Sequence, residues 1–231
     1  MEKRLLFLTV LGTLAVQAYS THFFYLPIAL NRIGFDSAST GVLLSVFSLA
    51  TTIARPPGSF LTERLGVKNS FFAAAALLTL FSIPMAFTRS FYGLLLLRGL
   101  TGVAYGLCMV SITAFQAMAI PERGRGRAFS WVAVGYVLPQ LILLPLLDRV
   151  FLRGFTAPYF WLIPLLGAGC TATAAVTPDL PRVFHEKKSW GKWEEAFASP
   201  SLVSLLASWV LFALANSPWT LAGSFLPFLS A

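Results

Sequence analysis

One arginine lies deep inside an apolar stretch of this sequence, where a charge is costly. Arg98 comes seven residues after Phe91, where that stretch begins. In a helix rising about 1.5 Å per residue, it falls roughly 10 Å from the helix end. An ionised side chain at that depth faces a water-filled cavity or a partner, although a long side chain can also snorkel to the nearer interface. Arg98 is therefore our first candidate for solute or ion chemistry.

The first apolar stretch contains two strongly polar side chains, Gln17 and His22. His22 and Tyr25 share one helix face because they are three residues apart. A histidine inside a membrane span indicates a functional site by default. A hydrogen bond between helices, or a place near the outer interface, explains it as well. We take all three residues as candidates.

Hydrolytic and metal-binding constellations are missing from the sequence. It has two histidines, His22 and His185, and two cysteines, Cys108 and Cys170, which both lie in apolar runs. Neither G-x-S-x-G nor H-E-x-x-H occurs. We therefore expect no enzymatic activity, no disulfide framework, no metal and no cofactor.

A compact charged turn follows the second apolar stretch. Two consecutive prolines, Pro56 and Pro57, come before it and are expected to bend or loosen the helix end. An acid beside a base, then a glycine and a second base, can pair with a helix end in one conformation and release it in another. The residues of interest are Ser59, Glu63, Arg64, Gly66 and Lys68.

Residues 59–68 resemble the loop 2–3 signature of the major facilitator superfamily, usually G-x-L-A-D-R-x-G-x-K. Arg64, Gly66 and Lys68 match as they stand. Ser59 stands at the first Gly position, which puts a close helix contact there in question, and Glu63 replaces Asp on a longer arm. The resemblance implies a gate that stabilises the outward-facing state through contacts with a second half of the protein.

A second pattern supports the same resemblance. Arg98, Gly102 and Gly106 are similar to the R-x-x-x-G-x-x-x-G pattern of span four in this superfamily, which the family associates with proton-coupled transport. Glycines four residues apart clear one helix face for close packing. Residues 121–128 also resemble the family's loop 4–5, commonly P-E-R-x-R-G-x-A. Pro139 belongs to a weaker likeness to the antiporter signature, and a simple helix kink explains it equally well.

The composition requires lipid as the outer solvent. Of 231 residues, 11% are charged and 57% hydrophobic, against about 25% charged residues in soluble domains. The net charge of +8 lies in short loops between apolar runs, so it indicates membrane topology and no nucleic-acid partner. Runs of about 20 apolar residues predict seven transmembrane helices. They are Leu5–Leu30, Thr40–Leu61, Ser70–Phe87, Phe91–Ile120, Phe129–Leu147, Pro158–Val176 and Leu202–Leu229.

The distribution of Lys and Arg predicts the orientation. Loops on the N-terminal side carry twelve of these residues, against four in the opposite loops. Positive charge accumulates on the cytoplasmic side, so we expect a cytoplasmic N-terminus in the cell (inner) membrane. The first stretch also resembles a signal peptide, but it is long enough to span a bilayer, and we favour an uncleaved helix.

The last span repeats the first at an offset of 200 residues. Residues 5–31 and 205–231 share eight identities over 27 positions without a gap, including Leu26-Pro27 against Leu226-Pro227. Chance matching between Leu/Ala-rich segments is the alternative. A true repeat makes span seven the first helix of a second six-helix unit, and the chain a truncated sequence that lacks the rest of that unit as an intramolecular partner.

These observations predict an all-α membrane protein with a six-helix bundle of two three-helix repeats, plus a seventh transmembrane helix. The expected divisions are the bundle (1–178), a central cytoplasmic loop (179–200) and the first helix of a C-terminal bundle (201–231). The resemblance covers the whole chain. It implies alternating-access transport of a small solute. Residues 54–56 look most like the small-molecule exporter branch, and together with the span-four pattern this likeness implies proton-coupled efflux. In the family, spans one, four and seven line the central cavity, which makes Gln17, His22, Arg98 and Asn216 our cavity residues.

Three other classes are less consistent with the sequence. A retinal pigment needs a lysine within a span, and all five lysines lie in loops or termini. A seven-helix receptor usually has its N-terminus outside. A non-transporting seven-helix fragment or regulatory subunit stays an alternative.

Overall fold

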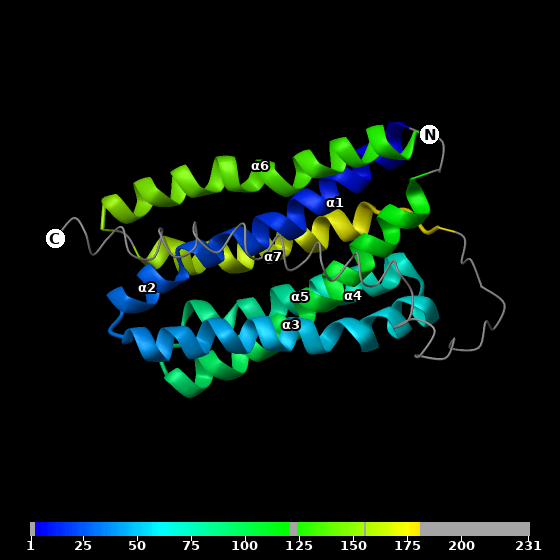
Figure 1. The fold of residues 1–231 in the computed structure, drawn as a ribbon. Helices are drawn as coiled ribbons and strands as arrows, with labels where there is room; N and C mark the ends of the chain where they lie inside the picture. Colours follow the sequence, from blue (N-terminus) through cyan, green and yellow to red (C-terminus); the bar gives the residue numbers. More distant parts are fainter. Residues whose placement is uncertain (1–2, 121–123, 155, 181–231) are drawn as a thin grey trace, which may run out of the picture. The chain divides into compact units, whose positions relative to one another are not determined.

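The computed structural model of the chain describes residues 3–120, 124–154 and 156–180. Within these ranges the chain forms α-helices and two short 3-10 turns, and no strand (Figure 1). The helical class expected from the sequence is therefore confirmed for this part of the chain. In order, the elements are α1 (Lys3–Thr21), η1 (His22–Phe24), α2 (Leu26–Arg32), α3 (Ser37–Leu65), α4 (Val67–Ser82), η2 (Pro84–Ala86), α5 (Phe91–Ala119), α6 (Arg125–Leu152) and α7 (Ala157–Val176).

Six segments of the described chain are long and apolar enough to cross a membrane. They correspond to the first six predicted spans, with helix ends that extend several residues further at α3 and α6. The predicted seventh span, with Asn216, and most of the predicted central loop lie outside the described residues. The six segments are Lys3–Phe24, Ser37–Leu65, Val67–Ala86, Phe91–Ala119, Arg125–Leu152 and Ala157–Val176.

The first predicted span, Leu5–Leu30, is not one continuous helix. α1 ends at Thr21, η1 follows, and α2 restarts at Leu26. Pro27 accounts for the break, because its nitrogen carries no hydrogen to donate to the carbonyl four residues earlier. A proline is accepted in the first turn of a new helix, which is where α2 places it. The sequence pattern predicted the apolar length of this span correctly and missed its interruption.

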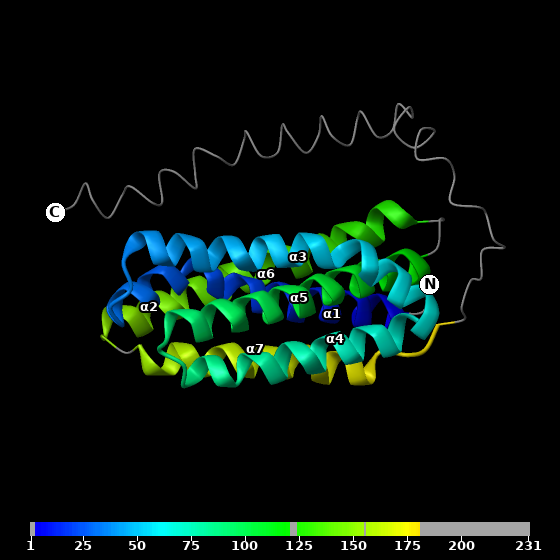
Figure 2. The same cartoon turned by 90° about the horizontal axis from the view of Figure 1, so that it is seen from below.

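The six spans pack as two related groups of three. α1 and α5 contact each other at the centre of these groups. α3 and α4 pack on α5, and in the same way α6 and α7 pack on α1. α4 and α7 also pack on each other. Exchanging α1, α3 and α4 for α5, α6 and α7 turns α3–α5 into α6–α1 and α4–α5 into α7–α1, and it leaves the α1–α5 and α4–α7 pairs unchanged. Figures 1 and 2 show the six spans side by side with their axes roughly aligned. The arrangement agrees with the two predicted three-helix repeats.

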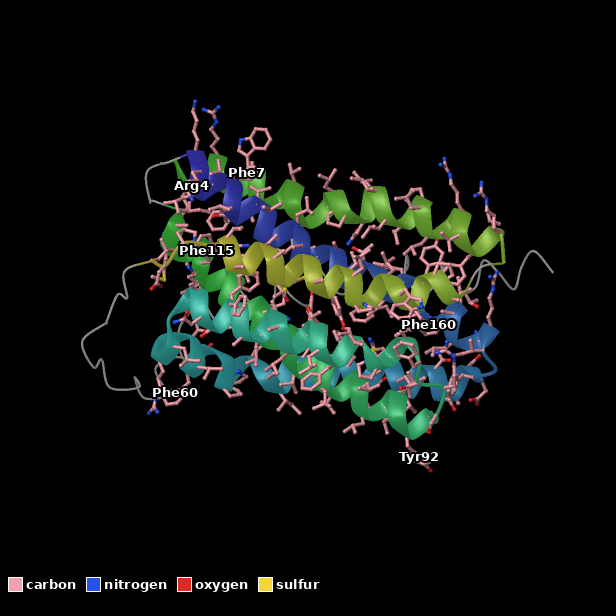
Figure 3. The ribbon with its side chains drawn as sticks, turned by 180° about the vertical axis from the view of Figure 1, so that it is seen from behind. Arg4, Phe7, Phe60, Tyr92, Phe115 and Phe160 are labelled. Atoms are coloured by element: carbon pink, nitrogen blue, oxygen red, sulfur yellow. The ribbon has the colours of Figure 1, made fainter. Side chains whose placement is uncertain are left out.

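Large apolar side chains cover the outside of this bundle. Phe7, Phe60 and Tyr92 point outward and are 64%, 47% and 79% exposed, whereas Phe115 and Phe160 lie between the helices (Figure 3). In water such a surface would be strongly unfavourable, so it is consistent with lipid as the surrounding solvent.

Two glycines bring α3 and α5 into close contact. A Cβ atom on Gly102 would lie 2.6 Å from the Phe47 carbonyl oxygen, and one on Gly106 would lie 2.6 Å from the Thr51 carbonyl oxygen. Thr51 Oγ1 also donates a hydrogen bond of 3.0 Å to the Gly102 carbonyl across the same contact. The predicted packing face of the span-four pattern is therefore present. On the related pair, Gly135 of α6 approaches α1 less closely, since a Cβ there would be 3.0 Å from the Val10 carbonyl oxygen.

The expected bend at Pro56 and Pro57 does not end α3, which continues to Leu65 with both prolines inside it. The helix stops at Gly66, which has φ of +84°. Glycine adopts this left-handed conformation without the steric cost that other residues carry. α4 begins at the next residue, so the predicted charged turn reduces to a single glycine between two helices.

We expect Gly106→Ala to lower the free energy of unfolding by about 1–3 kcal/mol, because the added methyl group meets backbone atoms of α3 that cannot move aside. Unfolding of the purified chain in detergent by SDS titration measures this. Gly99→Ala on the same helix is the matched control, since its Cβ would find its nearest neighbour, Val46 Cγ1, at 3.7 Å. That variant should be neutral or more stable by up to about 1 kcal/mol through helix propensity. Equal stability of the two variants would contradict the close-contact account.

Candidate functional site

Arg98 lies inside the bundle, two helical turns from the start of α5. Its side chain is 2% exposed, so it does not snorkel to the interface. The guanidinium carbon lies 4.3 Å from the ring centres of both Phe23, from η1, and Phe47, from α3. Its Nε donates a hydrogen bond of 3.2 Å to the Leu43 carbonyl on α3. One cation on α5 therefore contacts two other elements, η1 and α3.

The charge of Arg98 has no acidic partner in the described part of the chain. The acidic residues there are Asp36, Glu63, Asp148 and Asp179, and none lies within salt-bridge distance of the guanidinium. Its Nη1 atom is buried and makes no hydrogen bond with any described residue. A fixed positive charge with a spare donor is thus enclosed among aromatic and aliphatic side chains.

His22 stands next to this cation, at the break in span one. Its side chain is fully buried, and its ring centre lies 4.2 Å from that of Phe23. His22 Nδ1 contacts the Tyr19 carbonyl, which can only accept a hydrogen bond, so this nitrogen carries the hydrogen. In the neutral ring, Nε2 then carries the lone pair. Nε2 is buried without a partner in the described residues.

Two tyrosines support this region. The Tyr159 hydroxyl, from α7, donates a hydrogen bond of 2.9 Å to the His22 carbonyl at the break. Tyr19 is fully buried, shares a hydrogen bond of 2.8 Å with Ser82 of α4, and stacks at 6.0 Å on Tyr105 of α5. These contacts tie the interrupted span to three other spans.

The other two candidates of span one face different neighbours. Gln17 is half-buried, and its side-chain oxygen accepts a hydrogen bond of 3.0 Å from Ser20. Tyr25 is half-buried and stacks on Phe151 of α6 at 5.3 Å. The structure thus brings His22 and Arg98 together around Phe23, and it brings neither Gln17 nor Tyr25 into that cluster. His22 begins η1 and Tyr25 follows it, and the Tyr25 N–H donates a hydrogen bond of 3.0 Å to the His22 carbonyl.

The polar side chains of the charged turn are exposed or half-buried at the end of α3 and the start of α4, and Gly66 between the two helices is buried. Glu63 and Arg64 are exposed, and the Arg64 guanidinium lies 4.2 Å from the ring centre of Phe60. Ser59 is exposed, and the close helix contact falls instead at Gly58, whose Cβ would lie 3.0 Å from Leu107 of α5. Lys68 is half-buried. No ion pair joins these charges to one another or to another described residue.

Sequence reasoning missed Phe23, Phe47, Tyr19 and Tyr159. The chain has 21 phenylalanines in a largely apolar sequence, so no composition or spacing signal distinguishes the two that contact Arg98. Pro139, which the sequence singled out, is buried within α6 one turn beyond Gly135 and has a packing role only in this structure. No group of His, Cys, Asp and Glu in the described residues could hold a metal ion.

Two grooves open on the outside of the described bundle, and neither includes Arg98 or His22. One, of about 330 Å³, runs along α6 between Ser130 and Leu141. The other, of about 450 Å³, lies between α3 and α5 and is lined by Arg55, Ser59 and Thr113 among others. The cluster around Arg98 therefore does not open into either of these grooves in this conformation.

Comparison with known proteins places the chain in a family. The family model described as Major Facilitator Superfamily matches residues 8–231. The putative multidrug resistance protein MdtD of Salmonella typhi is 28% identical over 212 residues, which cover 86% of this chain and 42% of MdtD. The probable 4-methylmuconolactone transporter of Cupriavidus pinatubonensis is 31% identical over 115 residues, which cover 50% of this chain and 27% of that protein.

A solved structure extends the comparison to the fold. The crystal structure of the peptide transporter POT in complex with sulfate superimposes with a TM-score of 0.66 at 13% sequence identity. The match covers 94% of this chain and 47% of the transporter. At that identity the likeness concerns the fold alone. In each of these three comparisons, the chain spans less than half the length of its relative.

Proposed function

The chain belongs to the Major Facilitator Superfamily, a family of multi-pass membrane transporters, and we propose that it acts in secondary active transport of a small organic solute by alternating access. The observation that carries this proposal is the buried, unpaired charge of Arg98 beside the broken first span. The names of the two relatives, a multidrug resistance protein and a transporter of one small ring compound, agree with a small organic solute.

The energetics of Arg98 favour a functional role over a structural one. Enclosing an ion in a protein interior costs several kcal/mol. A desolvated cation–aromatic contact returns about 2 kcal/mol, and Arg98 has two such contacts. An aliphatic residue of similar size would fill the same space without the cost of burying a charge. Ionisable groups inside membrane spans mark solute, ion or proton pathways, and Arg98 has the burial expected of such a group.

Proton-coupled efflux is our more specific proposal. The unprotonated Nε2 of His22 is a buried acceptor, and histidine inside membrane spans commonly belongs to proton relays. The groups that surround it are Tyr19 on its own span, Arg98 on α5 and Tyr159 on α7. We infer export because MdtD is named as a putative multidrug resistance protein and because residues 54–56 resemble those of exporters.

The charged turn supports a second half as intramolecular partner. Glu63 and Arg64 are exposed and form no ion pair with other described residues, at the end of α3 that the loop 2–3 signature marks. We propose that these side chains contact a second six-helix half and stabilise the outward-facing state. On this proposal the 231-residue chain by itself completes no transport cycle, and it would act alone only as a non-transporting membrane fragment or regulatory subunit.

We propose a cytoplasmic N-terminus in the inner membrane, based on the excess of Lys and Arg at one end of the bundle. A membrane-impermeant thiol reagent added to intact cells should label Arg149→Cys, which lies at the opposite end and is exposed. Arg64→Cys, equally exposed, should be labelled only after the membrane is permeabilised. The reverse labelling pattern would overturn this orientation. Cys108 and Cys170 are buried, so they should contribute little background.

We expect Arg98→Ala to reduce solute flux to the background of empty vesicles while membrane insertion is unchanged. The measurement is flux into proteoliposomes of a transporter that contains this chain together with a second six-helix half. Arg89→Ala is the matched control, because Arg89 is exposed at the start of the same helix, and it should retain flux. Normal flux in Arg98→Ala would remove Arg98 from the mechanism. Flux by the 231-residue chain alone would show that it needs no second half.

We expect His22→Gln to abolish the dependence of flux on an imposed pH gradient. Glutamine keeps a donor and an acceptor at this position but does not change charge between pH 5 and 8. The assay compares flux with and without the gradient, in the same vesicles, for the variant and for His185→Gln, the other histidine of the chain. A gradient dependence that survives in His22→Gln would place proton coupling elsewhere.

A further inference from the structure

We propose that Phe23 and Phe47 form an aromatic clamp that takes the place of a counterion for Arg98 and positions its guanidinium. The clamp consists of these two rings and the Leu43 carbonyl. The proposal rests on the proposed function only for its consequence in transport; the clamp itself is a property of the described bundle. It makes both phenylalanines positioning residues, which act through Arg98.

The geometry of the clamp is tight on two sides. The ring centres of Phe23 and Phe47 lie 4.2 Å apart with their planes inclined by 58°, and the guanidinium carbon is 4.3 Å from each. α3 supplies both Phe47 and, one turn earlier, the Leu43 carbonyl that accepts the Nε hydrogen. The arginine is therefore held in direction as well as in place.

The aromatic faces provide negative electrostatic potential where no carboxylate is available. A ring attracts a cation through its quadrupole, and the attraction is larger when water is excluded. Arg98 meets this condition at 2% exposure, with no acidic side chain of the described bundle within salt-bridge distance. Unlike a carboxylate, the rings do not occupy hydrogen-bonding groups of the cation. Nη1 has no hydrogen-bond partner among the described residues, so its N–H groups are available to a further acceptor.

The clamp requires arginine at position 98. A planar guanidinium can lie against aromatic rings while its Nε points to a carbonyl in its own plane. The ammonium group of lysine is compact and strongly hydrated, and it lacks this geometry. Arg98→Lys therefore keeps the charge and should lose the fixed arrangement.

Phe23 links the clamp to the interruption of span one. It is the middle residue of η1, and its ring also lies against His22, at 4.2 Å between ring centres. A 3-10 segment inside a long helix often marks a hinge. Any rearrangement of residues 22–24 changes the distance between the Phe23 ring and the guanidinium, and with it the environment of the buried charge. The clamp thus couples the conformation of the break to Arg98.

The test is the NMR signal of the Arg98 side chain in the 231-residue chain, labelled with 15N-arginine and placed in lipid nanodiscs. The signal is identified by its loss in Arg98→Lys. Above the faces of two rings, the Nε–H proton should be shifted upfield of the exposed arginines and exchange slowly with water. A signal at the position of the exposed arginines in the unmodified chain would overturn the clamp, whatever the variants do.

Variants separate the rings from general packing. Phe23→Leu and Phe47→Leu keep an apolar side chain, and each should move the Arg98 signal back toward the exposed arginines. Phe71→Leu is the matched control, since Phe71 is fully buried in α4 and makes no ring contact with Arg98, and it should leave the signal in place. Equal movement in all three variants would overturn the proposal in favour of general loosening of the core.

Solute flux tests separately whether the clamp matters for transport. The assay uses the transporter that contains this chain together with a second six-helix half. Phe23→Tyr, which keeps the ring, should retain flux that Phe23→Leu loses. If the NMR signal shows the clamp and neither variant changes flux, the clamp exists and its role in transport is wrong. If Arg98→Ala also transports normally, the proposed function of Arg98 fails with it.

Discussion

The described bundle is governed by the absence of water around it. Lipid offers no hydrogen-bonding solvent, so a polar group that is not bonded within its own helix must find a partner elsewhere in the protein. Most buried hydroxyl groups do so locally, as Thr13 and Ser82 donate to carbonyls one turn earlier on their own helices. Others join helices, as Gln116 donates to Thr13 between α5 and α1 at 2.8 Å. Apolar side chains are solvated by lipid as well as by one another, so their burial does little to drive helix association. Close backbone contacts at glycines such as Gly102 and Gly106 therefore hold the helices together.

Against this background the two exceptions are informative. Arg98 Nη1 and His22 Nε2 are the buried side-chain nitrogens of the described residues that lack a hydrogen-bond partner, and both belong to residues in contact with Phe23. One is a donor and the other, in the neutral ring, is an acceptor. Their coincidence at the break in span one is difficult to attribute to packing, because packing favours neither a charge nor an unsatisfied imidazole there. On the proposed function, this is a place where stability is given up for transport.

The repeat symmetry of the bundle makes the break more distinctive. α1 and α5 occupy equivalent places in the two groups of three spans. α5 is continuous from Phe91 to Ala119, whereas span one is interrupted at η1. The interruption therefore does not follow from the shared architecture. It follows from Pro27, and it is stabilised by the Tyr159 hydrogen bond to the His22 carbonyl. Membership of the Major Facilitator Superfamily explains the six-span framework, and this chain's own residues explain the cluster within it.

The sequence alone determined the membrane environment, the six described spans, the packing face of Gly102 and Gly106, and the candidacy of Arg98 and His22. Each of these depends on the composition or spacing of neighbouring residues, which helix geometry converts directly into a face or a depth. Only the tertiary structure selected His22 over Gln17 and Tyr25 as the neighbour of Arg98, and only it identified Phe23 and Phe47. The sequence of an apolar run does not distinguish a phenylalanine that faces lipid from one that faces the core or a cation. The difference arises when separate spans meet, and no local pattern records which spans those are.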